Sequence, residues 1–272
     1  MSIGFAGSED LAQIKEIYHV CFPEDPDAFW DLELGCRMEP DNILVYREGE
    51  RILSTVQILS EFLTLGEETY PVQYIYAAAT RPEAQGRGLM GELLQHAHGI
   101  AKARTQRFSV LITQNDGLFA FYARFGYGDQ SRVGCLAAES SANIVGSLRK
   151  AETADIPRML ELYQQAGKGL LAVRRTEKSF AQQCAVYGNG ALVYERQGTV
   201  TAYGFKAGDY MLEAAGPDAR QLLAAAGVAE GATVPEDGLP MRRNGCVLPL
   251  DPEAEVLLKQ QNNIVYLNLM WN

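Results

Sequence analysis

The residues best placed to do chemistry in this sequence are the glycines of QGRGLMGELL, residues 85–94. Gly86 and Gly88 lie where an apolar run and a proline give way to a helical pattern, and Gly91 follows within that pattern. The first amides of a helix have no intrahelical acceptor and carry partial positive charge. Because glycine lacks a Cβ and tolerates positive φ, such a turn leaves these amides open to a phosphate-bearing ligand. A tight loop before an ordinary helix is the simpler alternative.

Two common nucleotide-binding loops do not fit this stretch. It is not GxGxxG with an acidic residue at the end of the following strand, and it has no GK[ST]. The strand expected just before the turn, residues 68–80, ends with the small side chains of Ala77–Ala79. Small side chains would let a ligand approach the backbone closely, although a tightly packed strand would use them equally well.

Periodicity and turn signals predict the elements that must position these residues. In the first half they predict helices at 8–20, 27–38, 88–104 and 117–125, and strands at 42–47, 51–64, 68–80 and 108–113. Hairpins come first and a β-α-β segment follows. This order indicates an α+β fold with a mixed sheet rather than a doubly wound parallel one.

The second half repeats the start of the first. EDLAQIKEIY at 9–18 resembles ADIPRMLELY at 154–163, and the hairpin pattern at 42–58 resembles that at 190–206. The offset is about 145–148 residues in both cases, which indicates two similar units in tandem. Because residues 138–150 are rich in small and polar side chains, we predict domains at 1–140 and 141–272.

Composition narrows the classes of function. The chain has 272 residues and a formal net charge of -10, which disfavours a nucleic-acid partner and favours cationic small molecules or basic peptides. Its five cysteines are scattered, without CxxC spacing or a histidine pattern for a metal, as in a reduced cytoplasmic protein. No apolar run approaches a membrane span, and no signal peptide is recognisable, so no membrane partner is expected.

The glycine turn together with FYARFGYG at 121–128 resembles the GCN5-related N-acetyltransferase (GNAT) superfamily. Its acetyl-CoA loop reads Q/R-x-x-G-x-G/A, and the matching residues here are Gln85, Gly86, Arg87, Gly88, Leu89 and Met90. Met90 departs from the final Gly or Ala and is similar to the Eis-like branch, the enhanced intracellular survival acetyltransferases. That branch joins a GNAT unit to a second, degenerate one. The resemblance therefore implies two tandem GNAT-like units, each a mixed, mostly antiparallel sheet flanked by helices.

The resemblance also implies where the co-substrate acetyl-CoA would bind. Amides from Gly86 to Gly91 would hold its diphosphate, with Arg87 adding charge. Backbone groups of Ala78, Ala79 and Thr80 would bind the pantetheine arm beside the strand at 68–80. Asn115 would contact the cofactor from the other side.

Tyr122 matches the family tyrosine that protonates the departing thiolate, while a backbone amide near Ala78 would polarise the thioester carbonyl. A phenol has a pKa near 10 and keeps its proton at neutral pH. The alternative is a core aromatic, because Phe119, Tyr122 and Phe125 share one face of the expected helix. The sequence leaves the general base open between a water chain, a carboxylate such as Glu33 or Glu61, and the terminal carboxylate at Asn272, which the Eis-like resemblance implies.

The second half is expected to have no cofactor site, because only Gly216 stands in the corresponding turn and Asp218 would repel a diphosphate. The sequence thus predicts an N-acetyltransferase that moves an acetyl group from acetyl-CoA to an amine of a small molecule or peptide, with no metal. A non-catalytic acyl-CoA-binding or regulatory protein is the alternative, favoured by Met90 and by the strand at 68–80 lacking a carboxylate near its end. A methyl- or phosphoryl-transfer enzyme would need motifs that are missing. A homo-oligomer is left open.

Overall fold

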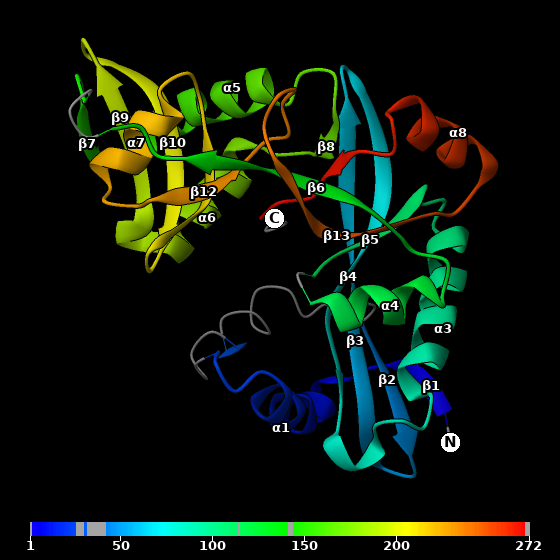
Figure 1. Cartoon of the computed structure of the whole chain (residues 1–272). Helices are drawn as coiled ribbons and strands as arrows, with labels where there is room; N and C mark the ends of the chain where they lie inside the picture. The colour runs from blue at the N-terminus through cyan, green and yellow to red at the C-terminus, as the bar shows by residue number, and fades with distance from the viewer. Residues whose placement is uncertain (1, 26–29, 32–41, 114, 141–143, 270–272) are drawn as a thin grey trace.

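The computed structural model describes residues 2–25, 30–31, 42–113, 115–140 and 144–269 (Figure 1). It is an α+β fold built on a mixed, mostly antiparallel sheet, so the predicted fold class is confirmed. The first-half elements are β1 (Ser2–Phe5), α1 (Leu11–Cys21), β2 (Ile43–Glu48), β3 (Arg51–Leu65), β4 (Glu68–Thr80), α3 (Leu89–Ala103), β5 (Phe108–Ile112), α4 (Asp116–Ala123) and β6 (Gly128–Ala137). The predicted helix at 27–38 falls largely outside the described residues.

The second half repeats this order of elements in part. They are β7 (Ser147–Lys150), α5 (Ile156–Ala166), β8 (Leu171–Val173), α6 (Glu177–Tyr187), β9 (Ala191–Arg196), β10 (Thr199–Ala207), β11 (Tyr210–Ala215), α7 (Ala219–Ala225), β12 (Glu230–Thr233), β13 (Met241–Pro249), α8 (Pro252–Gln260) and β14 (Val265–Tyr266). β9 and β10 form an antiparallel hairpin as β2 and β3 do, and β11 pairs in parallel with β12 as β4 does with β5. This repetition is what the sequence repeat predicts.

The two halves meet through exchanged strands. The sheet order is β1-β2-β3-β4-β5-β13-β6-β12-β11-β10-β9-β7. β13 from the second half therefore lies between β5 and β6 of the first, and β6 in turn pairs with β12. The predicted division at residue 140 consequently separates strands that share hydrogen bonds, and the domains at 1–140 and 141–272 stay a prediction.

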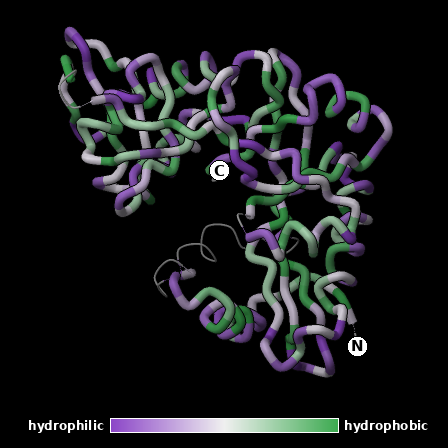
Figure 2. The backbone as a smooth tube through the Cα atoms, viewed as in Figure 1, coloured by the Kyte–Doolittle hydropathy of each residue, from purple (hydrophilic) through white to green (hydrophobic). Residues whose placement is uncertain are grey.

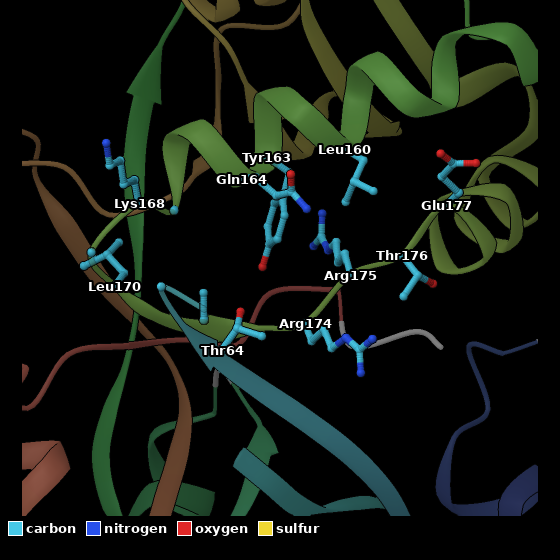
Figure 3. A pocket seen from close by; sticks show the side chains of 14 residues that line it. Thr64, Leu160, Tyr163, Gln164, Lys168, Leu170, Arg174, Arg175, Thr176 and Glu177 are labelled. Carbon is cyan, nitrogen blue, oxygen red and sulfur yellow. The ribbon is translucent and has the colours of Figure 1, made fainter. Parts of the chain in front are cut away.

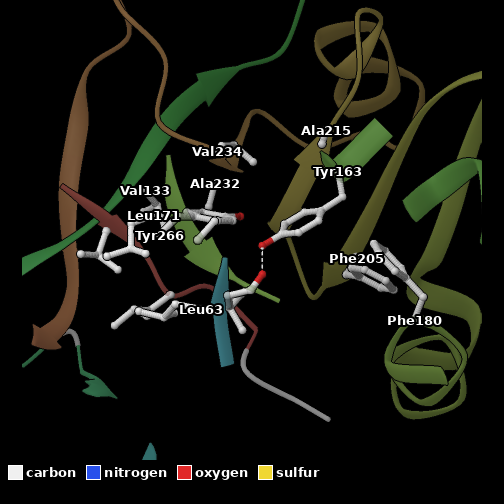
Figure 4. Close-up of a cluster of buried hydrophobic side chains, with 14 of the residues drawn as sticks. Leu63, Val133, Tyr163, Leu171, Phe180, Phe205, Ala215, Ala232, Val234 and Tyr266 are labelled. Atoms are coloured by element: carbon white, nitrogen blue, oxygen red, sulfur yellow. Dashed lines mark hydrogen bonds between the residues drawn. The ribbon is translucent and has the colours of Figure 1, made fainter. Parts of the chain in front are cut away.

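The largest buried cluster also spans both halves (Figure 4). It joins Leu63 of β3 to Tyr163 and Phe180 of helices α5 and α6. Tyr163, Leu63 and Tyr266 surround the same apolar space in Figure 4. Along the chain, hydrophobic residues concentrate in the strands and the inner faces of helices, and polar residues in the turns (Figure 2). The halves are thus held by a common core as well as by the sheet.

α3 packs against the sheet through an apolar stripe. Leu89, Leu93, Leu94, Ala97 and Ala101 recur at helical spacing and are all buried. The helix starts immediately after Gly88, whose φ of 85° lies in the left-handed region that suits glycine. Strong packing of this stripe fixes the N-terminus of α3 at the end of β4.

Candidate active site

β4 and β5 separate in the middle of the sheet. They pair in parallel only where Val72–Tyr74 lie beside Phe108–Val110. β4 continues to Thr80 and β5 to Ile112, with no further pairing between them in the described part of the chain. A cleft of ≈ 600 Å³ lies near the end of β4, bounded by the glycine turn, the start of α3 and α4. This cleft lies beside the end of the strand along which the resemblance places acetyl-CoA.

Most of the predicted site residues line this cleft. They are Ala78, Thr80, Gln85, Gly86, Gly88, Leu89, Met90, Gly91 and Tyr122. Ala79, Arg87 and Asn115 are not among its lining residues. Sequence reasoning missed Ala84 and one face of α4 and of the turn after it, formed by Leu118, Phe121, Arg124 and Phe125. The helical spacing of these residues could have identified that face, because they recur with Tyr122 at intervals of three and four.

A bulge in β4 shapes the wall of the cleft. The pairing with β3 shifts register between Thr55, opposite Ala79, and Gln57, opposite Tyr76. Within that shift Ala77 has a φ of 47°, which is uncommon for a residue with a Cβ. A bulge leaves its extra residue unpaired and redirects the backbone. Peptide groups around Ala78 are thereby turned away from the β3 ladder at the point where Ala78 lines the cleft.

The glycine turn has the open geometry that an anion requires. Gly86 and Gly88 have φ values of 76° and 85°, and a Cβ on either would meet nothing within 4 Å. The space in front of the first amides of α3 is therefore free of protein atoms on the glycine side. Gly91 serves a different purpose, because a Cβ there would lie 2.8 Å from the ring of Phe125. Because Gly91 has no Cβ, α3 can approach the end of α4.

Arg87 is held to one side of this turn. Its guanidinium forms an ion pair with Glu48 at the end of β2, and neither side chain is fully exposed. Arg81 pairs similarly with Glu16 of α1 at 2.8 Å. These contacts tie the loop after β4 to neighbouring elements. In this conformation an anion in the cleft would therefore contact backbone amides rather than the Arg87 guanidinium.

Tyr122 is a buried phenol that reaches the cleft from α4. Its ring packs edge-on against Phe121 and Tyr127, with centroids 5.1 and 5.7 Å away. Burial raises its pKa to about 12, so the hydroxyl stays protonated at neutral pH. Among the described residues no hydrogen-bond partner occupies this hydroxyl. The group is thus a proton donor available to a ligand in the cleft.

Contacts at the start of α4 orient that phenol. The side-chain oxygen of Asn115 accepts hydrogen bonds from Gly117 N (2.8 Å) and Leu118 N (3.3 Å), an N-cap that fixes the helix start. Arg243, from β13, donates to Asp116 at 2.6 Å and lies 4.5 Å from the ring centroid of Phe119. Asn115 therefore positions α4, and its predicted contact with a cofactor stays a prediction. Arg243 contacts α4 although it lies far from this helix in the sequence.

A polar network lies behind Tyr122. The hydroxyl of Tyr127 is 2.7 Å from Ser109 Oγ and 3.0 Å from His98 Nε2. Burial lowers the pKa of His98 to about 4, so the imidazole is neutral at pH 7. Ser109 in turn donates to Gln73 of β4 at 3.2 Å. These polar groups satisfy one another's hydrogen bonds, which gives Tyr127 a structural function.

Among the candidates for a general base, the structure describes only Glu61. Glu61 pairs with Val72, six residues before Ala78 on β4, which corresponds to about 20 Å along a strand. It is therefore too distant to deprotonate an amine at Ala78 directly. Glu33 and Asn272 lie outside the described residues. Within the described residues no cluster of His, Cys, Asp and Glu could hold a metal ion.

The corresponding region of the second half is filled by protein. A Cβ at Gly216 would lie 2.3 Å from the Thr201 carbonyl oxygen, so this turn is closed, unlike that at Gly88. On β11, Glu213 forms a fully buried ion pair with Arg175 and accepts a hydrogen bond from Tyr203 at 2.8 Å. Asp218 lies 3.5 Å from Arg196. These contacts support the expectation of one cofactor site per chain.

Glu213→Gln should destabilise the protein by about 3 kcal/mol, because it leaves the buried Arg175 cation uncompensated. Denaturant unfolding followed by circular dichroism measures this change. Glu195→Gln is the matched control, since its ion pair with Arg149 at 2.6 Å is partly exposed and should contribute less than about 1 kcal/mol. Equal losses of unfolding free energy in the two variants would contradict a structural function for the Glu213 pair.

Comparison with known proteins defines the class to which this cleft belongs. Residues 3–129 match the family model described as an acetyltransferase (GNAT) domain. The resemblance to the GNAT superfamily seen in the sequence is therefore confirmed for these residues. The GNAT fold supports acyl transfer, with acetyl-CoA as the donor that the family uses. No curated protein sequence matches the chain.

Solved structures extend the likeness in fold to nearly the whole chain. A GCN5-related N-acetyltransferase from Kribbella flavida is 15% identical, with a TM-score of 0.71 over 93% of this chain and 73% of that one. Eis1 from Mycobacterium abscessus is 13% identical, with a TM-score of 0.65 over 93% of this chain and 75% of that one. At these identities the likeness concerns the fold alone. In the described residues no helix has the length and apolar character needed to cross a membrane.

Proposed function

We propose that this protein is an acetyl-CoA-dependent N-acetyltransferase that acylates an amine by direct attack. The observation that carries the proposal is that Tyr122 lines the same cleft as the open turn at Gly86 and Gly88. Its phenol is protonated, and its hydroxyl has no partner among the described residues. The open turn would bind a phosphate of the coenzyme, and the phenol would protonate the leaving sulfur. Their coexistence in one cleft of ≈ 600 Å³ distinguishes this arrangement from a phosphate-binding loop alone.

The cofactor would enter along β4. Amides from Gly86 to Gly91 would bind its diphosphate, because they lie at the positive end of α3 and no side chain covers the glycines. The pantetheine arm would lie against the backbone of Ala78, Ala79 and Thr80. Gln85 donates to the Thr80 carbonyl at 3.2 Å, which ties the loop to the strand at this point. Leu89 and Met90 supply apolar contacts at the cleft.

The transfer itself would proceed through a tetrahedral intermediate. A neutral amine attacks the thioester carbon, and an amide beside the bulge, near Ala78, stabilises the oxyanion. The carbon–sulfur bond then breaks, and Tyr122 donates its proton to the coenzyme thiolate. The ammonium proton leaves to water, and the phenolate regains a proton from solvent. A pKa raised to about 12 favours this return of the proton.

The acceptor would be a cationic small molecule or peptide, since the chain carries a net charge of -10. The second half would act structurally, by supplying β13 and the Arg243 contact to α4. The thiols of Cys21, Cys135, Cys184 and Cys246 are free, which supports a cytoplasmic location. Assembly into a homo-oligomer is a separate proposal, which sedimentation of the purified chain would test.

Thiol release tests the proposed activity. The purified chain is incubated with acetyl-CoA and, separately, with polyamines, aminoglycosides and peptides bearing free amino termini. Acceptor-dependent release of coenzyme thiol, with the acetylated amine identified by mass, supports the proposal. Tight acetyl-CoA binding without transfer to any amine of the panel would favour a non-catalytic acyl-CoA-binding protein. Met90 favours this alternative because it departs from the Gly or Ala of the family's loop. Thermal stabilisation by ATP or S-adenosylmethionine, but not acetyl-CoA, would contradict both.

A further inference from the structure

Arg124 is the one charged side chain among the described residues that line the acyl-transfer cleft. Its guanidinium lies 4.9 Å from the ring centroid of Phe121, and its Nε is 3.5 Å from the Phe121 carbonyl oxygen. In the described part of the chain it pairs with no carboxylate. An unpaired cation in a chain of net charge -10 favours an anionic group of the ligand that enters this cleft.

Other arginines around the glycine turn already have carboxylate partners. The guanidinium of Arg87 pairs with Glu48, and that of Arg51 pairs with Glu83 in the loop after β4. A carboxylate beside each of these guanidinium groups offsets its charge. Among the described residues, the positive side-chain charge that a ligand in the cleft can meet is therefore that of Arg124.

The cations around the other large cavity do not converge on one point. That cavity, of ≈ 590 Å³, lies between the tip of the β3–β4 hairpin and helices α5 and α6 (Figure 3). Figure 3 shows Lys168 and Arg174 at opposite ends of it, so they do not hold one anionic group together. Arg124, by contrast, lines a cleft whose open amides would bind a phosphate of the same ligand.

Arg124 lies at the mouth of the acyl-transfer cleft. It is the C-cap of α4 and keeps helical backbone geometry. With 3.6 residues per turn, it lies about 60° around the helix from Phe121 and about 160° from Tyr122. Tyr122 is buried, Phe121 is half-buried and Arg124 is exposed. The three side chains therefore run from the floor of the cleft to its mouth.

The order of groups along coenzyme A matches this arrangement. The sulfur is at one end of the molecule, the diphosphate follows the pantetheine arm, and an adenosine with a phosphate on its ribose 3′ oxygen is at the other end. With the thioester at Tyr122 and the diphosphate at the glycine turn, the 3′-phosphate is the anionic group left for the mouth. A guanidinium suits it, because paired N–H donors match the oxygens of a phosphate.

We propose that Arg124 binds the 3′-phosphate of the coenzyme, so that the cleft selects coenzyme A over its dephospho form. The ring of Phe121 supports the guanidinium in this position. The inference rests on the proposed function, because it takes the thioester and the diphosphate to bind as described there.

Calorimetric titration with acetyl-CoA and with acetyl-dephospho-CoA tests this function of Arg124, because the two ligands differ only in the 3′-phosphate. We expect the parent to bind acetyl-CoA about 10-fold more tightly, as for one charge-assisted contact. Arg124→Met should weaken acetyl-CoA binding about 10-fold and change the affinity for acetyl-dephospho-CoA by less than about twofold. Arg124→Lys keeps the charge without the planar set of donors, so it should keep part of the preference.

Lys102→Met is the matched control for the loss of positive charge. Lys102 lies in the last turn of α3, about 20 Å from the start of that helix, so its replacement should change neither affinity. Equal affinity of the parent for the two ligands, or a preference that survives Arg124→Met, would overturn the proposal and leave the coenzyme site in place. An equal loss for both ligands would do the same, because it would place Arg124 at the diphosphate. Failure of the parent to bind either ligand would contradict the proposed function as well.

Discussion

Gly88→Glu is expected to raise the dissociation constant for acetyl-CoA by at least about 100-fold. Gly88 has a φ of 85°, so any side chain there strains the turn, at a cost of about 1–3 kcal/mol. The new carboxylate would also stand in the open space in front of the first α3 amides and repel the coenzyme diphosphate. Each lost charge-assisted hydrogen bond costs about 1.5–3 kcal/mol, and 1.4 kcal/mol corresponds to tenfold in affinity. Calorimetric titration with acetyl-CoA measures the loss.

Gly99→Glu is the matched control for this effect. Gly99 lies on the exposed face of the same helix, α3, and a Cβ there meets nothing within 4 Å. It introduces the same charge and removes the same residue type, yet it leaves the turn intact. Its affinity for acetyl-CoA should stay within about twofold of the parent. Equal losses in the two variants would mean that the turn at Gly88 is not the phosphate site.

Local sequence signals predicted the parts of the site that depend on neighbouring residues. The turn at Gly86 and Gly88, the start of α3 and the helix that carries Tyr122 all follow from turn chemistry and from helical spacing within about 20 residues. These signals act between neighbouring residues, so they do not depend on how the rest of the chain packs. They placed α3 and α4 within one or two residues of the observed bounds.

The remaining features depend on contacts between distant segments. Ala77 reads as an ordinary strand residue, and its left-handed conformation arises only because β3 and β4 pair with shifted register around it. Arg243 reaches α4 because β13 inserts between β5 and β6, more than a hundred residues away in sequence. Asn115 illustrates the same limit, because its side chain serves as an N-cap whose existence depends on where α4 begins. No periodicity or motif encodes such partners.

Tyr122→Phe removes one hydroxyl and is expected to lower the turnover number by about 100- to 10,000-fold, the range for loss of a positioned general acid. Affinity for acetyl-CoA should change by less than about twofold, because the phenylalanine ring keeps the contacts with Phe121 and Tyr127. Thermal stability should also be kept, since the hydroxyl has no partner among the described residues. Steady-state kinetics, calorimetric titration and thermal unfolding measure these quantities.

The pH dependence provides a second test of the same residue. Because burial raises the pKa of Tyr122 to about 12, its acid form predominates throughout the neutral and moderately alkaline range. The turnover rate of the parent should therefore rise with pH as the acceptor amine loses its proton, with no decline due to Tyr122 until near pH 12. A tyrosine acting instead as a base would have to be ionised, and activity at neutral pH would then be negligible.

Tyr127→Phe distinguishes a catalytic phenol from a structural one. The Tyr127 hydroxyl lies within hydrogen-bond distance of Ser109 and His98, so its loss should cost about 1–2 kcal/mol and lower the melting temperature by a few degrees. Turnover should be nearly unchanged, because this hydroxyl does not line the cleft. The two variants thus predict opposite outcomes for stability and rate. If Tyr122→Phe abolished acetyl-CoA binding while turnover survived at saturating donor, Tyr122 would be a binding residue and another group would protonate the thiolate.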